Sequence, residues 1–438
     1  MRLLRWTLNL ALVGGALLAA AFLLLLSPVT QAPPIAVPAS EDVQRARKTL
    51  KTLRDSEVAR GATTPIPVSA AEIEALLALG ARLLPGLRGA VALEDGAVTL
   101  LAALPVLEGR RWLEAEARIE DFTGGLRIAA LRVGRLDVPP DAARDLAVAL
   151  ANRRLGEEAG DRLLAAFPAM TASSDGVVLT RAHSGRDADQ VPLGKDVARR
   201  VVQAVGADVP SGPEVVRYLD AIATAFADGI LADEGSFLPH LRFTLELAYE
   251  RGAAGDLARA YTAAILALTH ACGSELIRGQ IGDLLEAGEA LDARHSGPSP
   301  CGTAGFHGRV DQRRHFITAA AMRAISRRGV AVSVGEFKEL SDMGFARGGF
   351  DFTDVAANNS GIRLSDRMMS APASAWPALL DAMETEEDVI VPLDGIPTLL
   401  SRSEFEARFG ALDSPDYAAM LARIESRIDA LPIHADMR

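Results

Sequence analysis

The sequence AVALEDGAVTLLAA, residues 90–103, sets two runs of small aliphatic residues on either side of Asp95-Gly96. Asp-Gly between such runs favours a type I′ turn, which needs positive φ at both central residues, so a β-hairpin is predicted here. Three more strands are predicted nearby, at 112–120, 126–133 and 176–180. Because a hairpin pairs its strands in opposite directions, the sheet is expected to be antiparallel.

Two helices are predicted to pack with this sheet. Ser69-Ala-Ala-Glu72 is a capping box that opens a helix ending near Leu84. Pro139-Pro140 stands where a second helix begins, because the first helical turn does not use the N–H group that proline lacks. That helix is predicted to run to about Phe167. An α+β domain with an antiparallel sheet is therefore expected over residues 64–182.

The second half of the chain is predicted to be mostly α-helical. After a polar linker, apolar residues recur at helical spacing as far as Ala293, and a Gly- and Pro-rich segment follows at 295–310. We therefore expect a helical domain over residues 195–293 and a second helical module over residues 311–434. The fold class of the whole chain is α+β with a mostly α-helical C-terminal half.

The N-terminus is predicted to cross a membrane. Trp6–Leu26 carries no charge, and about 21 helical residues span the roughly 30 Å of a hydrocarbon core. Arg2 and Arg5 precede this stretch, so the positive-inside rule leaves the N-terminus cytoplasmic. We predict that residues 1–27 are a transmembrane signal anchor in a bacterial inner membrane, with the body in the periplasm; a cleaved signal peptide is the alternative. Residues 28–63 are predicted to be a Pro-rich spacer and a short helix.

Composition limits the partners and the compartment. The chain has 438 residues, 49% of them hydrophobic, and a formal net charge of -11, which argues against nucleic acid as a partner. Its composition excludes a disordered chain, a collagen and a disulfide-dense mini-protein. Cys272 and Cys301 are its two cysteines. A periplasmic location permits a disulfide between them, but the sequence equally allows two unpaired thiols.

Seven polar residues of the C-terminal half are predicted to converge from three helices. They are Asp311, His315, Glu336, Glu339, Asp342, Asp354 and Asn358. The first two lie four residues apart on one helix face, and the next three follow at three-residue steps on another. Thr353 is predicted to cap the third helix, which carries the last two.

Two interpretations of this cluster stay open. In the first, Glu336 acts as a base and a divalent metal is held by His315, Glu339, Asp342 and Asp354. In the second, the cluster is a buried hydrogen-bond network that fixes the register of the helices, with His315 bonded to Asp354.

Three motifs carry a family resemblance: Asp311-x-x-x-His315-Phe316, Gly335-x-x-x-Glu339-x-x-Asp342 and Phe352-x-Asp354-x-x-x-Asn358-x-x-Gly361. In order, spacing and residue type they resemble VanZ-like proteins and a related family of small bacterial lipoproteins. VanZ-like proteins place this pattern in membrane helices and favour Gln where this chain has Asp342. Four cations make these segments unsuitable for lipid here: Arg323, Arg327, Arg328 and Lys338. The whole layout resembles an uncharacterised proteobacterial family that joins such a module to a membrane-anchored front half.

The first domain also resembles known proteins. The helix at 69–84, the Asp95-Gly96 hairpin and the passage Arg132–Pro139 into a helix resemble TULIP-like lipid-binding domains and small membrane-anchored bacterial relatives. The resemblance implies a sheet wrapped on a helix, with aliphatic inner faces that hold an acyl chain. A solid hydrophobic core is the alternative for the same residues.

Together these patterns predict a binding or scaffolding protein of the cell envelope, and not an enzyme. Its expected partners are the membrane and a lipid or an envelope protein, and no cofactor is expected. The alternative is a hydrolase acting on envelope lipid or glycan through a divalent metal at His315, Glu339, Asp342 and Asp354. The motifs of serine hydrolases, zinc proteases and phosphate-binding loops are absent.

Overall fold

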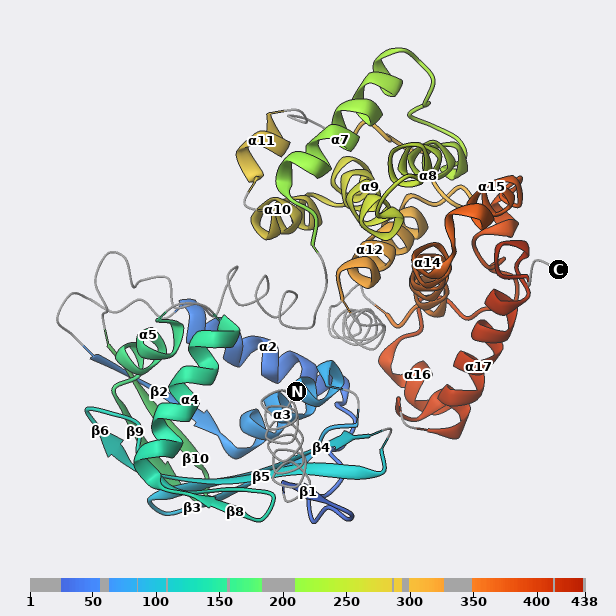
Figure 1. Cartoon of the computed structure of the whole chain (residues 1–438). Coiled ribbons are helices and arrows are strands. Elements are labelled where there is room, and N and C mark those ends of the chain that lie inside the picture. Colours follow the sequence, from blue (N-terminus) through green and yellow to red (C-terminus); the bar gives the residue numbers. More distant parts are fainter. Residues whose placement is uncertain are drawn as a thin grey trace, which may run out of the picture. The chain divides into compact units, whose positions relative to one another are not determined.

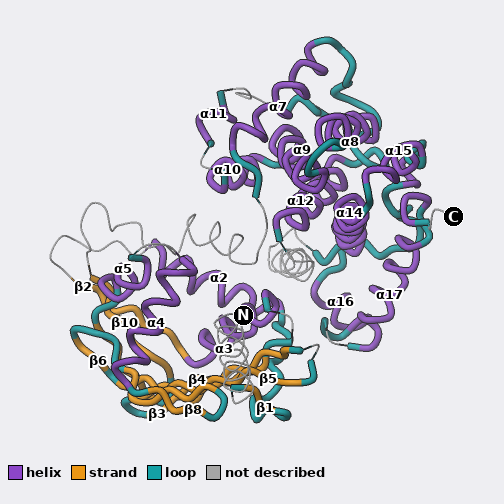
Figure 2. The backbone as a smooth tube through the Cα atoms, viewed as in Figure 1, coloured by secondary structure: helices purple, strands orange, loops and turns teal. Residues whose placement is uncertain are grey.

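The structure is a computed structural model, and its described residues form two compact units. The description covers residues 25–55, 63–84, 86–107, 109–155, 158–182, 209–285, 287–293, 299–326, 349–412 and 414–435. Unit 1 contains the described residues up to 182, apart from Ala39–Glu41, and unit 2 contains those from 209 onward. Helices and strands occupy unit 1, whereas unit 2 is built from helices (Figure 2).

Unit 1 is α+β with antiparallel strands, as predicted, but the strands form two sheets where a single sheet was expected, and the strand predicted at 176–180 lies in the smaller one. The larger has the order β3-β4-β5-β7-β8, with β1 also paired to β5. Its strands are β1 Leu26–Ser27, β3 Arg88–Glu94, β4 Ala97–Val106, β5 Arg111–Glu120, β7 Ile128–Val133 and β8 Leu136–Val138. The smaller has the order β2-β10-β9-β6, formed by Thr63–Ser69, Gly176–Ala182, Ala169–Ser173 and Phe122–Thr123.

The predicted hairpin is present, but its turn differs from the predicted type. Glu94 pairs with Ala97, so Asp95 and Gly96 make a two-residue loop. Of these two residues only Gly96 has a positive φ, of 81°. A type I′ turn needs positive φ at both, so the turn is not of that type.

The described residues of unit 1 also form four helices: α2 Ser40–Asp55, α3 Ala70–Leu83, α4 Pro140–Leu155 and α5 Ala159–Ala166. The predicted capping box opens α3, because Ser69 and Glu72 exchange hydrogen bonds. The single helix predicted after Pro139 is instead the pair α4 and α5. Glu158, with φ of 59°, interrupts it, and the Asn152 side chain accepts a hydrogen bond from the Gly160 N–H across the break.

The short helix predicted within 28–63 is present as α2, but the described part of the predicted spacer before it packs in unit 1. Leu26, the last residue of the predicted membrane span, pairs with Leu113 in β5, and Pro34 forms a β-bridge with Arg88. Val43 and Ala46 of α2 are buried in the same unit. Burial of these aliphatic side chains holds the segment against the sheet. The rest of the predicted anchor lies outside the described residues, and among those described no helix has the length and apolar character to cross a bilayer.

Unit 2 surrounds the buried helix α9, Leu257–Cys272, which is apolar over most of its surface. The helices α7, α8, α12 and α14 all contact α9 (Figure 1). The sequence predicted two separate helical modules, over 195–293 and 311–434. In the structure they belong to one unit, because α12 of the second packs on α9 of the first. The other helices in the described part of unit 2 are α7 Gly212–Ala227, α8 Leu238–Gly252, α10 Glu275–Leu284, α11 Gly288–Asp292, α12 Val310–Ile325, α14 Phe352–Ser370, α15 Trp376–Asp381, α16 Arg402–Phe409 and α17 Pro415–Asp429.

A short 3₁₀ helix, η3 Pro432–His434, packs on α14 and gives unit 2 a predicted sensitivity to acid. Burial of the His434 imidazole, with the charges of Arg363 and Arg367 nearby, lowers its pKa to about 4. The unfolded chain, with a histidine pKa of about 6.5, therefore takes up the proton first as the pH falls. Stability contributed by the neutral imidazole is lost as the pH falls from about 6.5 towards 4.

We expect a shift from pH 7 to pH 5 to cost the wild type about 1 kcal/mol more than the His434→Gln variant, after discounting for partial solvent exposure. Urea unfolding followed by circular dichroism at the two pH values measures this difference. Equal losses in both proteins would contradict the assignment to His434.

Candidate functional site

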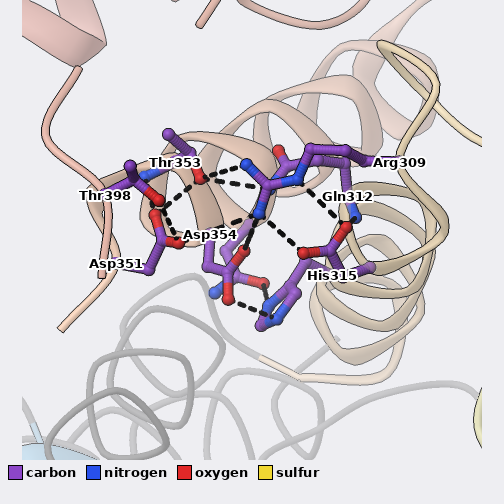
Figure 3. A network of polar contacts seen from close by, with 9 residues as sticks. Arg309, Gln312, His315, Asp351, Thr353, Asp354 and Thr398 are labelled. Atoms are coloured by element: carbon purple, nitrogen blue, oxygen red, sulfur yellow. Dashed lines mark hydrogen bonds and ion pairs between the residues drawn. The ribbon is translucent and has the colours of Figure 1, made fainter. Parts of the chain in front are cut away.

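The α12–α14 cluster, formed by Arg309, Asp311, Gln312, His315, Asp351, Thr353, Asp354, Asn358 and Thr398, is the first candidate site. Its side chains come from the start of α12, the start of α14 and the loop before α16 (Figure 3). Gly361 brings the two helices close, since a Cβ there would lie 3.0 Å from the Phe316 carbonyl carbon and 3.2 Å from the Ala320 nitrogen. This close approach lets short polar side chains reach across the helix pair.

His315 lies at the centre of the contacts between the two helices. Its Nε2 is 2.9 Å from Oδ2 of Asp354, and its Nδ1 is 3.2 Å from Oδ1 of Asn358. Gln312, one turn before His315, donates from Nε2 to Oδ1 of Asp354 at 2.9 Å. Both ring nitrogens of His315 therefore have partners, so a ligand or metal on either nitrogen would have to displace Asp354 or Asn358.

Arg309, the residue before α12, joins the exposed and buried parts of the cluster. Its guanidinium makes two bonds to the Asp311 carboxylate, of 3.1 and 2.6 Å, and donates to Thr353 Oγ1 at 3.0 Å (Figure 3). Burial alone would raise the pKa of Asp311, but the hydrogen bonds and charge of Arg309 hold it below its usual value. The same hydrogen bonds raise the pKa of Arg309. Both side chains are therefore charged at neutral pH, and they form an ion pair at the exposed end of the cluster.

Asp351, and not the predicted Thr353, caps α14. Oδ1 of Asp351 accepts from the Thr353 backbone N–H at 2.8 Å and from the Thr353 hydroxyl at 2.5 Å. Its other oxygen accepts from the Thr398 hydroxyl at 2.7 Å. Aspartate accepts hydrogen bonds from the first N–H groups of a helix as threonine does. The cap therefore lies two residues before the predicted one and uses the same kind of hydrogen bond.

Arg313 and a disulfide bond hold the loop that leads into α12. Cys272 and Cys301 are joined, with 5.4 Å between their Cα atoms, which makes the pairing that the sequence left open. The buried Arg313 guanidinium donates to the carbonyl oxygens of Cys301, Gly302 and Ala304. Burial lowers the pKa of Arg313 to about 10, which still leaves it charged at neutral pH. These contacts fix the position of the first turn of α12 and hence of His315.

The structure brings four of the seven predicted site residues together: Asp311, His315, Asp354 and Asn358. The other three, Glu336, Glu339 and Asp342, lie outside the described residues. Within the described part of the chain, no group of three or more His, Cys, Asp or Glu side chains is arranged to hold a metal. The described geometry is that of a hydrogen-bond network joining two helices.

Five members or neighbours of the cluster were missed from the sequence: Arg309, Gln312, Arg313, Asp351 and Thr398. Gln312 and Arg313 lie within the Asp311–His315 motif, and both are fully buried. They were missed because such polar side chains are usually exposed. Asp351-x-Thr353 is a recognisable helix-capping pattern that would have found Asp351. Thr398 carries no local signal, because a loop 47 residues later in the sequence brings it to Asp351.

The second candidate site is one face of the six-stranded sheet in unit 1. Residues paired across antiparallel strands share a face, so the register gives its composition. We name it the apolar sheet face, and its paired sets are Leu93 with Val98 and Ile119, Val91 with Leu100 and Ala117, Gly89 with Ala102 and Ala115, and Leu131 and Val133 with Val138 and Leu136. Every side chain in these sets is aliphatic.

Only part of the apolar sheet face is covered. Val98, Val91, Leu93 and Ile119 pack into a hydrophobic cluster with the smaller sheet and α3. Further along the face, Leu100 and Leu136 remain 38% and 46% exposed. Helix α4 contacts β7 and lies on the same side of the sheet as α3 (Figure 1). Leu146 and Leu150 of α4 share the helix face of the buried Ala143 and are themselves exposed.

The opposite face of the same sheet is charged. It carries ion pairs between Glu94 and Arg118, at 2.8 Å, and between Glu116 and Arg132. These four side chains line an open pocket of about 770 Å³. These ion pairs lie on one face of the sheet, whereas the exposed Leu100 and Leu136 lie on the apolar one.

Comparisons of the chain with models of protein families, with curated proteins and with solved structures found no match.

Proposed function

We propose that this protein is a single-pass protein of the bacterial inner membrane whose periplasmic body binds lipid through the apolar sheet face of unit 1. The role is binding or scaffolding, without catalysis. The observation that carries the proposal is the one-sided sheet, on which aliphatic side chains stay exposed beside a covered hydrophobic cluster. An exposed apolar patch of this kind marks an interaction site on a folded protein.

The chemistry of the face favours an acyl chain over a protein partner. Its side chains offer no hydrogen-bond donor or acceptor, and no aromatic side chain of the kind that anchors protein interfaces. Among the described residues, unit 1 holds nine of the eleven exposed large hydrophobic side chains and unit 2 holds two. Apolar surface is thus concentrated in the unit that follows the predicted membrane anchor.

The periplasmic location is supported by the disulfide between Cys272 and Cys301. Both cysteines are fully buried in unit 2, within the helical core. Structural disulfides form and persist in oxidising compartments and are rare in the cytosol. With the apolar stretch Trp6–Leu26 and the preceding arginines, this favours a body on the outer side of the inner membrane.

The lipid proposal is tested by photo-crosslinking the full chain in nanodiscs. The probe is phosphatidylglycerol with a diazirine near the end of one acyl chain, and adducts are mapped by peptide mass spectrometry. We expect adducts on β4 and α4 as well as within the N-terminal stretch. The Leu100→Gln variant is expected to lower the adducts on α4 by at least about fivefold. An acyl chain that covered the glutamine amide would remove its hydrogen bonds to water, so binding would be weakened.

Val178→Gln is the matched control for this experiment. Val178 lies on β10 in the smaller sheet and is 37% exposed, against 38% for Leu100. Both substitutions affect half-exposed side chains and are expected to change stability little. Adducts confined to residues 1–26, or equal effects of the two substitutions, would contradict lipid binding by the apolar sheet face.

A second function, a metal-dependent hydrolase acting on envelope lipid or glycan, is favoured by one observation. His315 contacts Asp354, and Arg309 links Asp354 to Asp311, whose side chain is 50% exposed, so the cluster reaches the surface. Equilibrium dialysis of the full chain against Zn²⁺ or Mn²⁺ tests it, with the Glu339→Gln variant for comparison. Stoichiometric binding that the variant loses would support this function, and no binding by the wild type would reject it.

A further inference from the structure

One end of the six-stranded sheet gathers features that suit a membrane surface. We name it the membrane edge and define it by Leu84, Leu107, Arg110, Arg111, Trp112 and Arg135. At this end β3, β5 and β8 begin and β4 and β7 finish, since the strands alternate in direction. The residues of the membrane edge therefore lie in the turns and first strand positions at a single end of unit 1.

The chain enters unit 1 at this same end. Leu26 pairs with Leu113, one residue after Trp112 in β5. A Cβ on Gly134, in the turn between β7 and β8, would meet the backbone of Leu25. The uncharged stretch Trp6–Leu26 thus ends in a strand of the sheet, with no linker between them. If that stretch spans the bilayer, the membrane edge lies at the bilayer surface.

Aliphatic side chains at this edge are exposed. Leu84 follows α3 and is 48% exposed, and Leu107, in the turn after β4, is 54% exposed. Leu136, at the start of β8, follows Arg135 of the membrane edge and lies on the apolar sheet face. The apolar surface therefore continues from the edge onto the face, without an intervening charged strand.

Cations and an aromatic ring accompany these leucines. Arg110 and Arg135 are exposed in the two turns of the edge, and Arg111 is exposed at the start of β5. Arg88 stacks on the Trp112 ring with 5.0 Å between guanidinium carbon and ring centroid. The nearby Glu114 carboxylate accepts hydrogen bonds from the Thr30 hydroxyl and the Gln31 N–H. Arginine and tryptophan beside exposed leucines are the residues that bind anionic headgroups and the membrane interface.

We infer that the membrane edge docks on the surface of an anionic phospholipid bilayer, with its leucines among the headgroups and its arginines on the lipid phosphates. The inference rests on the proposed function, because it requires the chain to be anchored. It deepens that function by naming where the body meets the membrane. It also gives an acyl chain a continuous apolar path, through Leu136, from the bilayer to the apolar sheet face.

The test uses the full chain with p-benzoylphenylalanine in place of Leu107 or Leu136, in nanodiscs of phosphatidylglycerol or of phosphatidylcholine. Val178, exposed on β10, is the control position for the same label. After illumination we expect lipid adducts at positions 107 and 136 and none at 178. Adducts at 107 are expected to be at least about fivefold more abundant in phosphatidylglycerol, and to lose that preference in an Arg110→Gln, Arg111→Gln, Arg135→Gln variant.

The outcomes separate this inference from the proposed function. A chain that stays in the nanodisc but gives no lipid adduct at 107 and 136 overturns the membrane edge and leaves the anchor standing. A preference for phosphatidylglycerol that survives loss of the three arginines overturns the role given to them. A chain that elutes free of the nanodisc overturns both the anchor and the inference that depends on it.

Discussion

Replacing Gly361 by alanine is expected to destabilise unit 2 by about 3 kcal/mol. The added methyl group would meet the Phe316 carbonyl and the Ala320 nitrogen, which are backbone atoms of α12. Side chains can rotate away from such a clash, but helix backbone cannot, so α12 and α14 would have to separate. Separation would also lengthen the contacts of His315 with Asp354 and Asn358. The measurement is the free energy of unfolding from urea titration monitored by circular dichroism.

Gly279→Ala is the control for the effect of alanine in a helix. Gly279 lies within α10, and a Cβ there would have no neighbour within 4 Å. Alanine is the better helix former, so this variant is expected to gain roughly 0.5–1 kcal/mol. A loss at Gly361 no larger than about 0.5 kcal/mol would mean that the helices tolerate separation, and the close approach would not organise the cluster.

Local patterns in the sequence predicted the elements whose causes are local. The capping box at Ser69 and Glu72 opens α3 as predicted, because both partners are within one turn. The hairpin around Gly96 was equally predictable. Strand β2 was missed because Pro65 and Pro67 argue against a strand, yet β2 is an edge strand, where proline is tolerated. Its pairing partner β10 is more than 100 residues away, so no local signal revealed it.

The difference in polarity between the two faces of the six-stranded sheet could not be predicted from the sequence, for another reason. Strand β4, Ala97–Val106, has only one polar residue, Thr99, so alternation along the strand does not separate its two faces. The polarity of the second face comes from β5 and β7, where Glu116, Arg118 and Arg132 alternate with aliphatic residues. Register across strands therefore defines the apolar sheet face, and register is a property of the fold.

The cluster was predicted in part because helical spacing fixes side-chain direction. His315 and Asp311 on α12, and Asp354 and Asn358 on α14, are pairs four residues apart, so each pair shares a face. Sequence could not say that the two faces meet, or that Asp351 and Thr398 extend the network. It also could not rank a network above a metal site, because both use the same residue types.

Replacing Asp354 by alanine is expected to cost unit 2 about 3–4 kcal/mol of stability. The carboxylate is buried, and its removal leaves His315 Nε2 and Gln312 Nε2 without the acceptor they now share. Asp354→Asn keeps the shape and one acceptor oxygen, so we expect about half that loss. Urea unfolding at pH 7 gives both values.

Asp429→Ala is the control for Asp354→Ala, because it removes a carboxylate that is exposed. Asp429 of α17 forms an ion pair with Arg363 of α14, but its side chain is 54% exposed, so less than about 1 kcal/mol is expected. Residues kept for chemistry commonly cost a protein stability, whereas residues kept for structure supply it. A strong loss at Asp354 would therefore favour a network that fixes two helices in register. A neutral or stabilising Asp354→Ala would contradict that network. It would favour the hydrolase, because the Asp354 carboxylate would then contribute nothing to the free energy of unfolding and would be kept for chemistry.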